Sequence, residues 1–252
     1  MWWLIPLFLA GFILVHLFKM LRLYLVLMEH RIGFGRFVLL YVKTTLVNLI
    51  IPFKMGELYR IFCISRETKH WQVGVLSILV DRFFDTLALC IILLPADLLV
   101  FDRLSFITIL FLCIMVLIVI CYISILPTYK YLNRYLIKQK SSARSMVALR
   151  GLDVIKVWYD FTQNLISGRF ALILLFSFAG WAFEIGTIKT LASILELPFG
   201  MGDFVTYIQA IFGIGSSGLL KPYTRYSIGI MFVFTVAGLI AMLINSRSKK
   251  KA

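Results

Sequence analysis

Residues 71–100 read WQVGVLSILVDRFFDTLALCIILLPADLLV. Nearly every side chain in this stretch is apolar, and the stretch is longer than the roughly 20 residues with which an α-helix crosses a bilayer. Asp81, Arg82 and Asp85 lie near its middle, where each ionisable residue costs roughly 2.5 to 3.5 kcal/mol on membrane-insertion scales. We therefore expect a spanning helix whose three charged residues pair with one another, line a polar cavity or serve a function.

The rest of the chain has the same character. Of its 252 residues, 61% are hydrophobic, and the net charge of +14 comes largely from basic residues between apolar runs. This arrangement is typical of membrane topology and argues against nucleic-acid binding. We expect a single all-α domain over residues 1–252, a polytopic integral membrane protein. Its predicted spanning segments are 2–18, 72–94, 104–126, 170–195 and 227–245.

Two shorter apolar segments, 37–53 and 204–220, are interpreted through the excess of Lys and Arg on the cytoplasmic side. If each dips into the membrane and returns, from opposite faces, 20 of the 26 Lys and Arg residues lie inside. We therefore expect re-entrant helical hairpins near residues 37–60 and 204–225. If both segments crossed fully instead, the chain would have seven helices and a weaker charge bias.

We expect the protein in the inner (cytoplasmic) membrane. In the preferred topology the N-terminus is outside, and the C-terminus and a basic loop at 127–169 are cytoplasmic. In this count, Lys19 and Arg22 follow the first spanning run and belong to a cytoplasmic loop. Hairpins that enter from opposite faces are typical of inverted repeats in transporters. We hold the inverted repeat as a hypothesis.

The segment 48–60, NLIIPFKMGELYR, could complement the charged triplet. Its proline and glycine let the chain turn, so a new helix can begin at Gly56. Glu57 and Arg60 would then share one face, and the helix N-terminus, with Lys54 or Arg60, would suit a phosphate. The alternative interpretation is a solvated amphipathic turn at the cytoplasmic surface.

The charged residues of the predicted spanning segments have positions that follow from helix geometry. Asp81 and Asp85 share a face, and Arg82 can reach Asp85 at i,i+3. A structural ion pair that locks this helix to its neighbours is one interpretation; a side of a hydrophilic groove is the other. Glu184 is either hydrogen-bonded to a neighbouring Trp or backbone group, or acts as a proton carrier or a partner for Arg82.

Several of these residues form a pattern that spans most of the chain: Asn48, Pro52, Gly56, Glu57, Arg60, Arg82, Asp85, Trp181 and Glu184. The pattern resembles the flippase-like family of integral membrane proteins, which includes the transmembrane domain of lysylphosphatidylglycerol synthetases. The resemblance implies a fold with re-entrant hairpins and movement of a lipid or lipid-linked molecule between leaflets. The family usually has a Pro/Gly-rich stretch ending in a glutamate near the second hairpin, whereas residues 213–222 contain no acid. The aminoacyl-transferring domain of the synthetases is also missing from these 252 residues.

These observations predict translocation of an anionic lipid or a lipid-linked envelope precursor, such as a phospholipid or polyprenyl phosphate. Arg60 and Arg82 would contact the phosphate, and nearby acids would balance them and exchange protons. The expected substrate-binding residues are Asn48, Lys54, Glu57, Arg60, Asp81, Arg82, Asp85, Trp181 and Glu184.

Two alternatives come from other functional classes. Asp81 and Asp85 with a metal could serve a membrane-embedded lipid-modifying enzyme. The chain could also be a structural accessory subunit of an envelope glycosyltransferase, or a partner for a second copy of itself. For the translocase we expect no catalytic residue, no metal and no cofactor; the GxGxxG match at 213–218 lacks the strand–helix–strand context of a dinucleotide site.

Overall fold

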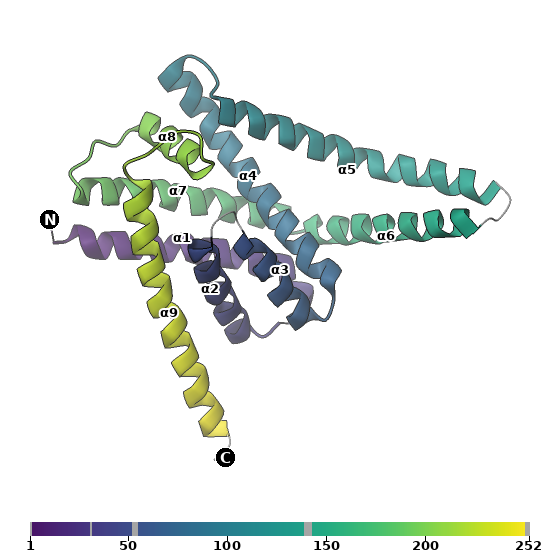
Figure 1. Ribbon diagram of the computed structural model, residues 1–252, viewed down its shortest axis with the longest axis horizontal. Coiled ribbons are helices and arrows are strands. Elements are labelled where there is room, and N and C mark those ends of the chain that lie inside the picture. Colours follow the sequence, from purple (N-terminus) through teal and green to yellow (C-terminus); the bar gives the residue numbers. More distant parts are fainter. Residues whose placement is uncertain (1, 31, 52–54, 139–142, 250–252) are drawn as a thin grey trace.

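The computed structural model describes residues 2–30, 32–51, 55–138 and 143–249, and over these ranges the chain is helical without a strand. The prediction of an all-α fold is confirmed. A short 3-10 turn, Met28–His30, follows the first helix. The α-helices, labelled in Figure 1, are α1 (Leu4–Leu27), α2 (Phe34–Ile50), α3 (Met55–Thr68), α4 (Trp71–Phe101), α5 (Phe106–Lys138), α6 (Ala143–Ile166), α7 (Phe170–Ile194), α8 (Met201–Ile211) and α9 (Leu220–Lys249).

Within the described ranges, five helical segments are long and apolar enough to cross a membrane: Leu4–His30, Trp71–Phe101, Phe106–Leu136, Phe170–Ile194 and Leu220–Met242. Each overlaps one segment predicted from the sequence, so the expected number of spanning helices is confirmed. The helices α2, α3 and α8 have 17, 14 and 11 residues. Re-entry of these shorter helices into a bilayer stays a prediction.

The helices α1 and α7 form an antiparallel pair through the centre of the molecule (Figure 1). Small residues allow the close approach, because a Cβ on Gly11 would lie 2.6 Å from the hydroxyl oxygen of Thr187. Farther along, Phe18 stacks on Phe183 with ring centroids 5.4 Å apart. This pair is the frame against which α4 places its charged residues.

The helix α1 is longer than its predicted segment and continues to Leu27. Lys19 and Arg22 therefore lie inside a helix, and the prediction that they belong to a loop is wrong. Arg22 is 1% exposed. An apolar helix tolerates both cations because carboxylates of α4 and α7 pair with them. Charges compensated inside the protein carry no information about which face is cytoplasmic.

The helices α2 and α3 form the first predicted helical hairpin, and glycines bring α3 close to its two neighbours. A Cβ on Gly56 would lie 2.6 Å from the Cβ of Asn48 on α2. A Cβ on Gly74 of α4 would lie 2.7 Å from the backbone oxygen of Ile61 on α3. The predicted helix start at Gly56 is correct to within one residue, since α3 begins at Met55. The turn predicted around Pro52, and with it Lys54, falls in residues 52–54, which lie outside the described residues.

The second predicted hairpin, 204–225, is a single short helix followed by an irregular return. The helix α8 ends at Ile211, and the next helix, α9, begins at Leu220. Gly213 and Gly215 take positive φ angles of 77° and 99°, which side chains with a Cβ rarely adopt. Phe204 and Ile208 of α8 are fully buried in the core formed with α4 and α7.

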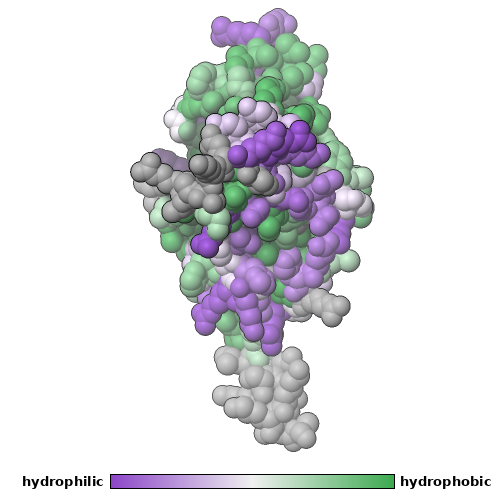
Figure 2. Space-filling model, turned by 90° about the vertical axis from the view of Figure 1, so that its right-hand side faces the viewer, coloured by the Kyte–Doolittle hydropathy of each residue, from purple (hydrophilic) through white to green (hydrophobic). Residues whose placement is uncertain are grey.

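The basic stretch 127–169 is largely helical. The helix α5 continues through it to Lys138, and α6 returns alongside, with Tyr122 stacked on Tyr159 at a centroid distance of 5.0 Å. Figure 1 shows this pair projecting from one end of the molecule, and Figure 2, which views that end, shows hydrophilic side chains gathered there. A cytoplasmic location of this end stays a prediction.

Candidate functional site

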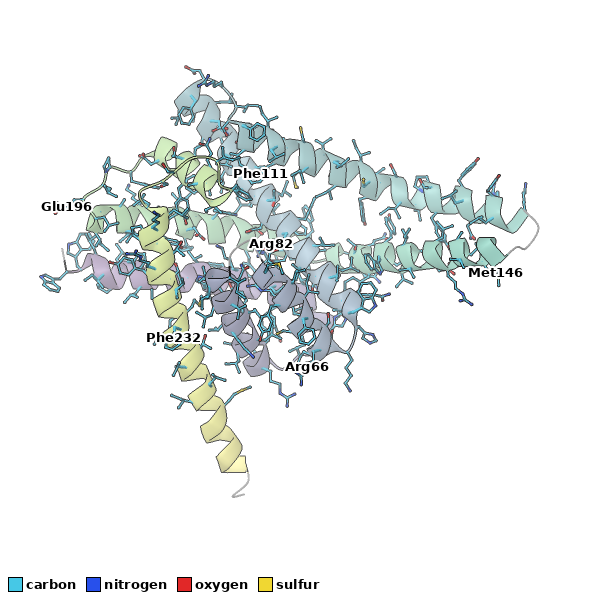
Figure 3. All side chains as sticks on the ribbon, in the orientation of Figure 1. Arg66, Arg82, Phe111, Met146, Glu196 and Phe232 are labelled. Atoms are coloured by element: carbon cyan, nitrogen blue, oxygen red, sulfur yellow. The ribbon has the colours of Figure 1, made fainter. Side chains whose placement is uncertain are left out.

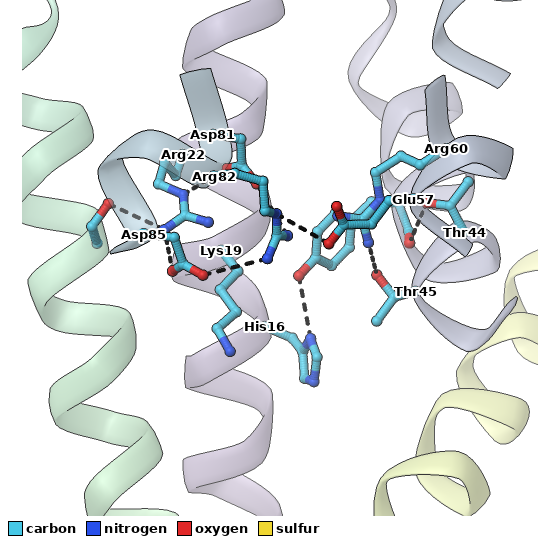
Figure 4. Close-up of polar contacts among 12 residues, drawn as sticks. His16, Lys19, Arg22, Thr44, Thr45, Glu57, Arg60, Asp81, Arg82 and Asp85 are labelled. Carbon is cyan, nitrogen blue, oxygen red and sulfur yellow. Dashed lines mark hydrogen bonds and ion pairs between the residues drawn. The ribbon is translucent and has the colours of Figure 1, made fainter. Parts of the chain in front are cut away.

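A polar cavity of about 150 Å³ lies between α1, α2, α3 and α4. Its lining carries four cations and two carboxylates, and two further acids, Glu57 and Glu184, pair with lining cations from outside the cavity wall. Figure 4 shows most of the contacts described below. The lining residues are His16, Lys19, Arg22, Tyr41, Thr45, Asn48, Leu49, Arg60, Asp81, Arg82 and Asp85.

Arg22 joins α1 to both acids of the charged triplet. Its Nε donates a hydrogen bond to Asp81 Oδ1 at 2.6 Å, and its Nη1 donates to Asp85 Oδ1 at 2.6 Å. The same Nη1 also donates to the hydroxyl of Ser177 on α7 at 3.1 Å. The two carboxylates share one face of α4 as predicted, because they lie four residues apart on the helix. Their closest cation comes from α1 rather than from Arg82.

Arg82 makes the predicted contact with Asp85, at 3.4 Å, and two more. It approaches Asp81 at 3.3 Å and Glu57 of α3 at 3.4 Å. Charge-assisted hydrogen bonds of this kind are normally 2.7 to 2.9 Å long, so the Arg82 contacts are loose. The side chain is 38% exposed, whereas that of Arg22 is 2% exposed. Arg82 is thus the cation of the triplet region that a ligand can reach.

Arg60 is buried beside the cavity at 4% exposure. Its Nε donates to the hydroxyl of Thr44 at 3.2 Å, and its Nη2 donates to the hydroxyl of Thr45 at 2.9 Å. Its guanidinium carbon lies 5.5 Å from the ring centroid of Tyr41. None of the ion pairs between described residues includes Arg60. A buried cation with neutral partners is poorly compensated.

Glu184 of α7 pairs with Lys19 of α1 and accepts a hydrogen bond from the Tyr223 hydroxyl of α9 at 3.0 Å. These partners differ from the predicted ones, which were a Trp, a backbone group or Arg82. Trp181 instead donates its Nε1 hydrogen to the backbone oxygen of Asp85 at 3.2 Å. Because Lys19 also lines the cavity, it connects the Glu184 region to the polar cavity.

Asn48 lies at the cavity wall, and its buried Oδ1 has no hydrogen-bond partner among the described residues. His16 of α1 also lines the cavity, and its Nδ1 is 3.2 Å from the hydroxyl of Tyr41 on α2. Lys54, the remaining predicted site residue, lies outside the described residues. The structure thus brings Asn48, Arg60 and the charged triplet together around one space.

Metal binding finds little support in the described part of the chain. No three His, Cys, Asp or Glu side chains gather there as a metal site would require. Asp81 and Asp85, the pair suggested for a metal, both direct their oxygens at arginine nitrogens. Their geometry is that of buried ion pairs.

The sequence model of a known family, the lysylphosphatidylglycerol synthase TM region, matches residues 1–247. The chain belongs to this family. No curated protein and no solved structure matches the chain. The suspected family relationship is confirmed. The family is a transmembrane region, and its description is consistent with a lipid-related role in the membrane. The polar cavity lies wholly inside the matched residues.

Sequence reasoning missed the contribution of α1 to the site and, apart from Asn48, that of α2. Lys19 and Arg22 were assigned to a loop because they interrupt an apolar run. The apolar run resumes at once with Leu23, Leu25 and Val26, and this resumption was the available signal for a longer helix. The hydroxyls of Thr44 and Thr45 had no signal, since threonines are common in membrane helices.

Proposed function

We propose that this protein binds the anionic headgroup of a lipid in the polar cavity and moves it between the leaflets of the cytoplasmic membrane. The observation that carries the proposal is Arg60, which is buried at 4% exposure and, among the described residues, is paired only with hydroxyls and an aromatic ring. A phosphate is a strong acceptor for a guanidinium and would supply the missing negative charge. Membership of a lipid-related membrane family supports the same substrate class.

The second phosphate contact in this proposal is Arg82. Its three carboxylate contacts are 3.3 to 3.4 Å long, so a ligand can replace one of them at small cost. Arg22 plays a different part, because its 2.6 Å bonds neutralise Asp81 and Asp85. A headgroup would enter between Arg60 and Arg82 while its hydrocarbon chains remain in the lipid.

The proposal includes a group that can exchange protons during transport. Glu184 is 6% exposed and lies between Lys19, which lines the cavity, and Tyr223 on α9. Buried acids of this kind serve as proton carriers in membrane transporters. Coupling to the proton gradient then predicts that translocation in liposomes responds to an imposed pH difference, and that Glu184→Gln removes this response.

The topology is part of the proposal: one domain over 1–252, an outside N-terminus, a cytoplasmic C-terminus and hairpins that re-enter the membrane. The distribution of basic residues supports it, because 20 of the 26 Lys and Arg residues, among them Arg36 and Arg150, fall on the predicted cytoplasmic side. Single cysteines at these positions, in a background without the native cysteines, report their side through labelling by a membrane-impermeant maleimide. Labelling of Arg36→Cys and Arg150→Cys from opposite sides would overturn the topology.

Translocation is tested in liposomes that contain a fluorescent phosphatidylglycerol, with a membrane-impermeant reductant added outside. The protein should speed the loss of inner-leaflet fluorescence, and phosphatidylcholine with the same fluorophore should move more slowly. Arg60→Gln should reduce the rate at least about tenfold, the effect of losing roughly one charged hydrogen bond. Arg66→Gln, on the exposed face of the same helix, is the matched control and should leave the rate unchanged.

The outcomes separate the functional classes. If no headgroup moves faster than in empty liposomes and none binds, the translocase proposal fails. Binding without movement would favour the structural accessory subunit. Metal-dependent turnover of a lipid by the purified protein, lost in Asp81→Asn, would favour the enzyme.

A further inference from the structure

A second cavity, of about 630 Å³, lies mainly between α4 and α5 and is almost wholly apolar. Figure 1 shows these two helices meeting at their connection and separating toward their other ends. We call this space the α4–α5 cleft. Its floor contains buried side chains and its rim exposed ones, among them Val80, Phe84 and Met115 for the floor and Leu79, Ile118 and Val119 for the rim.

Arg82 lines both the α4–α5 cleft and the polar cavity. Figure 3 places it midway along α4, between the α2–α3 hairpin and α5. A partly exposed guanidinium beside an apolar membrane-facing surface is costly unless an anion or water reaches it. The two spaces therefore adjoin at a cation, with a polar space that contains Arg60 on one side and a hydrocarbon-like space on the other. This arrangement matches an anionic amphiphile, whose charged group would lie in the polar space and whose hydrocarbon part would lie in the apolar one.

The length of the cleft agrees with one hydrocarbon chain. Along α4 its lining runs from Leu76 to Thr86, which is about 15 Å at 1.5 Å per residue. The hydrocarbon core of a bilayer is roughly 30 Å thick, so the cleft is about as long as one leaflet is deep. On α5 the lining from Ile114 to Tyr122 covers about 12 Å.

We propose that the α4–α5 cleft holds a hydrocarbon chain of the lipid whose phosphate lies between Arg82 and Arg60. The inference rests on the proposed function, because it takes the polar cavity as the headgroup site. It narrows the ligand class, since a phosphate group is common to a lipid headgroup and to a soluble phosphate ester. Only a lipid uses both spaces, and the chain adds apolar contact area that a soluble ester lacks.

The test uses the full chain in phosphatidylcholine nanodiscs that contain a phosphatidylglycerol with a diazirine on one acyl chain. After illumination, mass spectrometry locates the adducts. We expect them at the cleft rim, near Leu79, Ile118 and Val119. Ile118→Trp fills the cleft and should reduce these adducts at least about tenfold, as the loss of roughly two buried methylenes would. Ile120→Trp is the matched control, because Ile120 is exposed on the same helix but is not part of the cleft lining.

The same sample separates a lipid from a free phosphate ester. Unlabelled phosphatidylglycerol should compete with the probe, while glycerol 3-phosphate at equal concentration should compete far less. Equal competition, or adducts that Ile118→Trp leaves unchanged, would overturn the cleft as a chain site, even if the liposome assay showed translocation. Conversely, cleft adducts with the expected variant pattern, but without translocation, would defeat the transport proposal and keep the lipid site. Because Ile118 is exposed, its variant should fold, which a monodisperse gel-filtration peak checks.

Discussion

Two buried arginines that line the same cavity, Arg22 and Arg60, differ in their partners. Arg22 is held by two carboxylates at 2.6 Å each, whereas Arg60 is held by two threonine hydroxyls at 3.2 and 2.9 Å. Their exposures are similar, 1% and 4%. Burial alone therefore does not tell a structural cation from a ligand-binding one. The neutral partners of Arg60 leave its charge available, and those of Arg22 use its charge inside the protein.

The largest expected effect is on folding, at Arg22. Arg22→Gln leaves Asp81 and Asp85 with one loosely bound cation, and loss of one member of a buried ion pair costs about 3 to 5 kcal/mol. Thermal unfolding in detergent should show a correspondingly lower midpoint. Arg36→Gln, at an exposed ion pair 3.8 Å long, should change stability by less than about 1 kcal/mol. Addition of Asp81→Asn to Arg22→Gln should restore part of the loss, because it removes an orphaned charge. Equal stability of Arg22→Gln and wild type would end the comparison.

A smaller effect is expected from Gly56→Ala, which changes only the Arg60 side. The new Cβ would lie 2.6 Å from the Asn48 Cβ, so α3 must move away from α2. Overpacking of this kind typically costs about 1 to 3 kcal/mol. The shift should also weaken phosphatidylglycerol binding, since Arg60 is on α3 and its threonine partners are on α2. Gly35→Ala is the control, because a Cβ there meets no atom within 4 Å. If Gly56→Ala is less stable but binds phosphatidylglycerol normally, the packing of α3 on α2 does not determine binding.

The substitution matched to Arg22→Gln is Arg60→Gln, and its expected effect is on binding rather than folding. Removal of a buried charge without an acidic partner should change stability by no more than about 1 kcal/mol, because nothing is left uncompensated. Phosphatidylglycerol binding should fall about tenfold. Unfolding midpoints and binding isotherms measured on both variants distinguish the arginines, because Arg22→Gln should lower mainly the stability and Arg60→Gln mainly the binding. A large stability loss in Arg60→Gln would show that both arginines are structural.

The smallest effect is expected from Arg82→Lys. The three carboxylate contacts of Arg82 are at least 3.3 Å long, and an ammonium keeps the charge but loses the planar fork. Stability should change by less than about 1 kcal/mol, while phosphatidylglycerol binding should weaken more than twofold. The ratio of the two changes places Arg82 between Arg22 and Arg60. A loss of stability without a loss of binding would assign Arg82 to the structural class.

The sequence predicted those features that depend on spacing within one helix. The spanning helices, the start of α3 and the Arg82 contact with Asp85 all follow from local periodicity. Contacts between helices could not be predicted from local periodicity, because sequence spacing does not show which side chains meet across a bundle. The partners of Arg22 are an example: the resumed apolar run after it indicates a longer helix, but only the position of α4 beside α1 shows that Asp81 and Asp85 neutralise its charge.

The glycine contacts of α3 determine when the site is built. Gly56 holds α3 against α2, and Gly74 of α4 does the same on the other side of α3. The walls that carry Arg60, its threonines and Arg82 are thus set in place when the chain folds. The entropy of ordering these side chains is lost at that stage, so a ligand that arrives later need not supply it. A preorganised site of this kind should bind a headgroup with little change in the backbone of the α2–α3 hairpin.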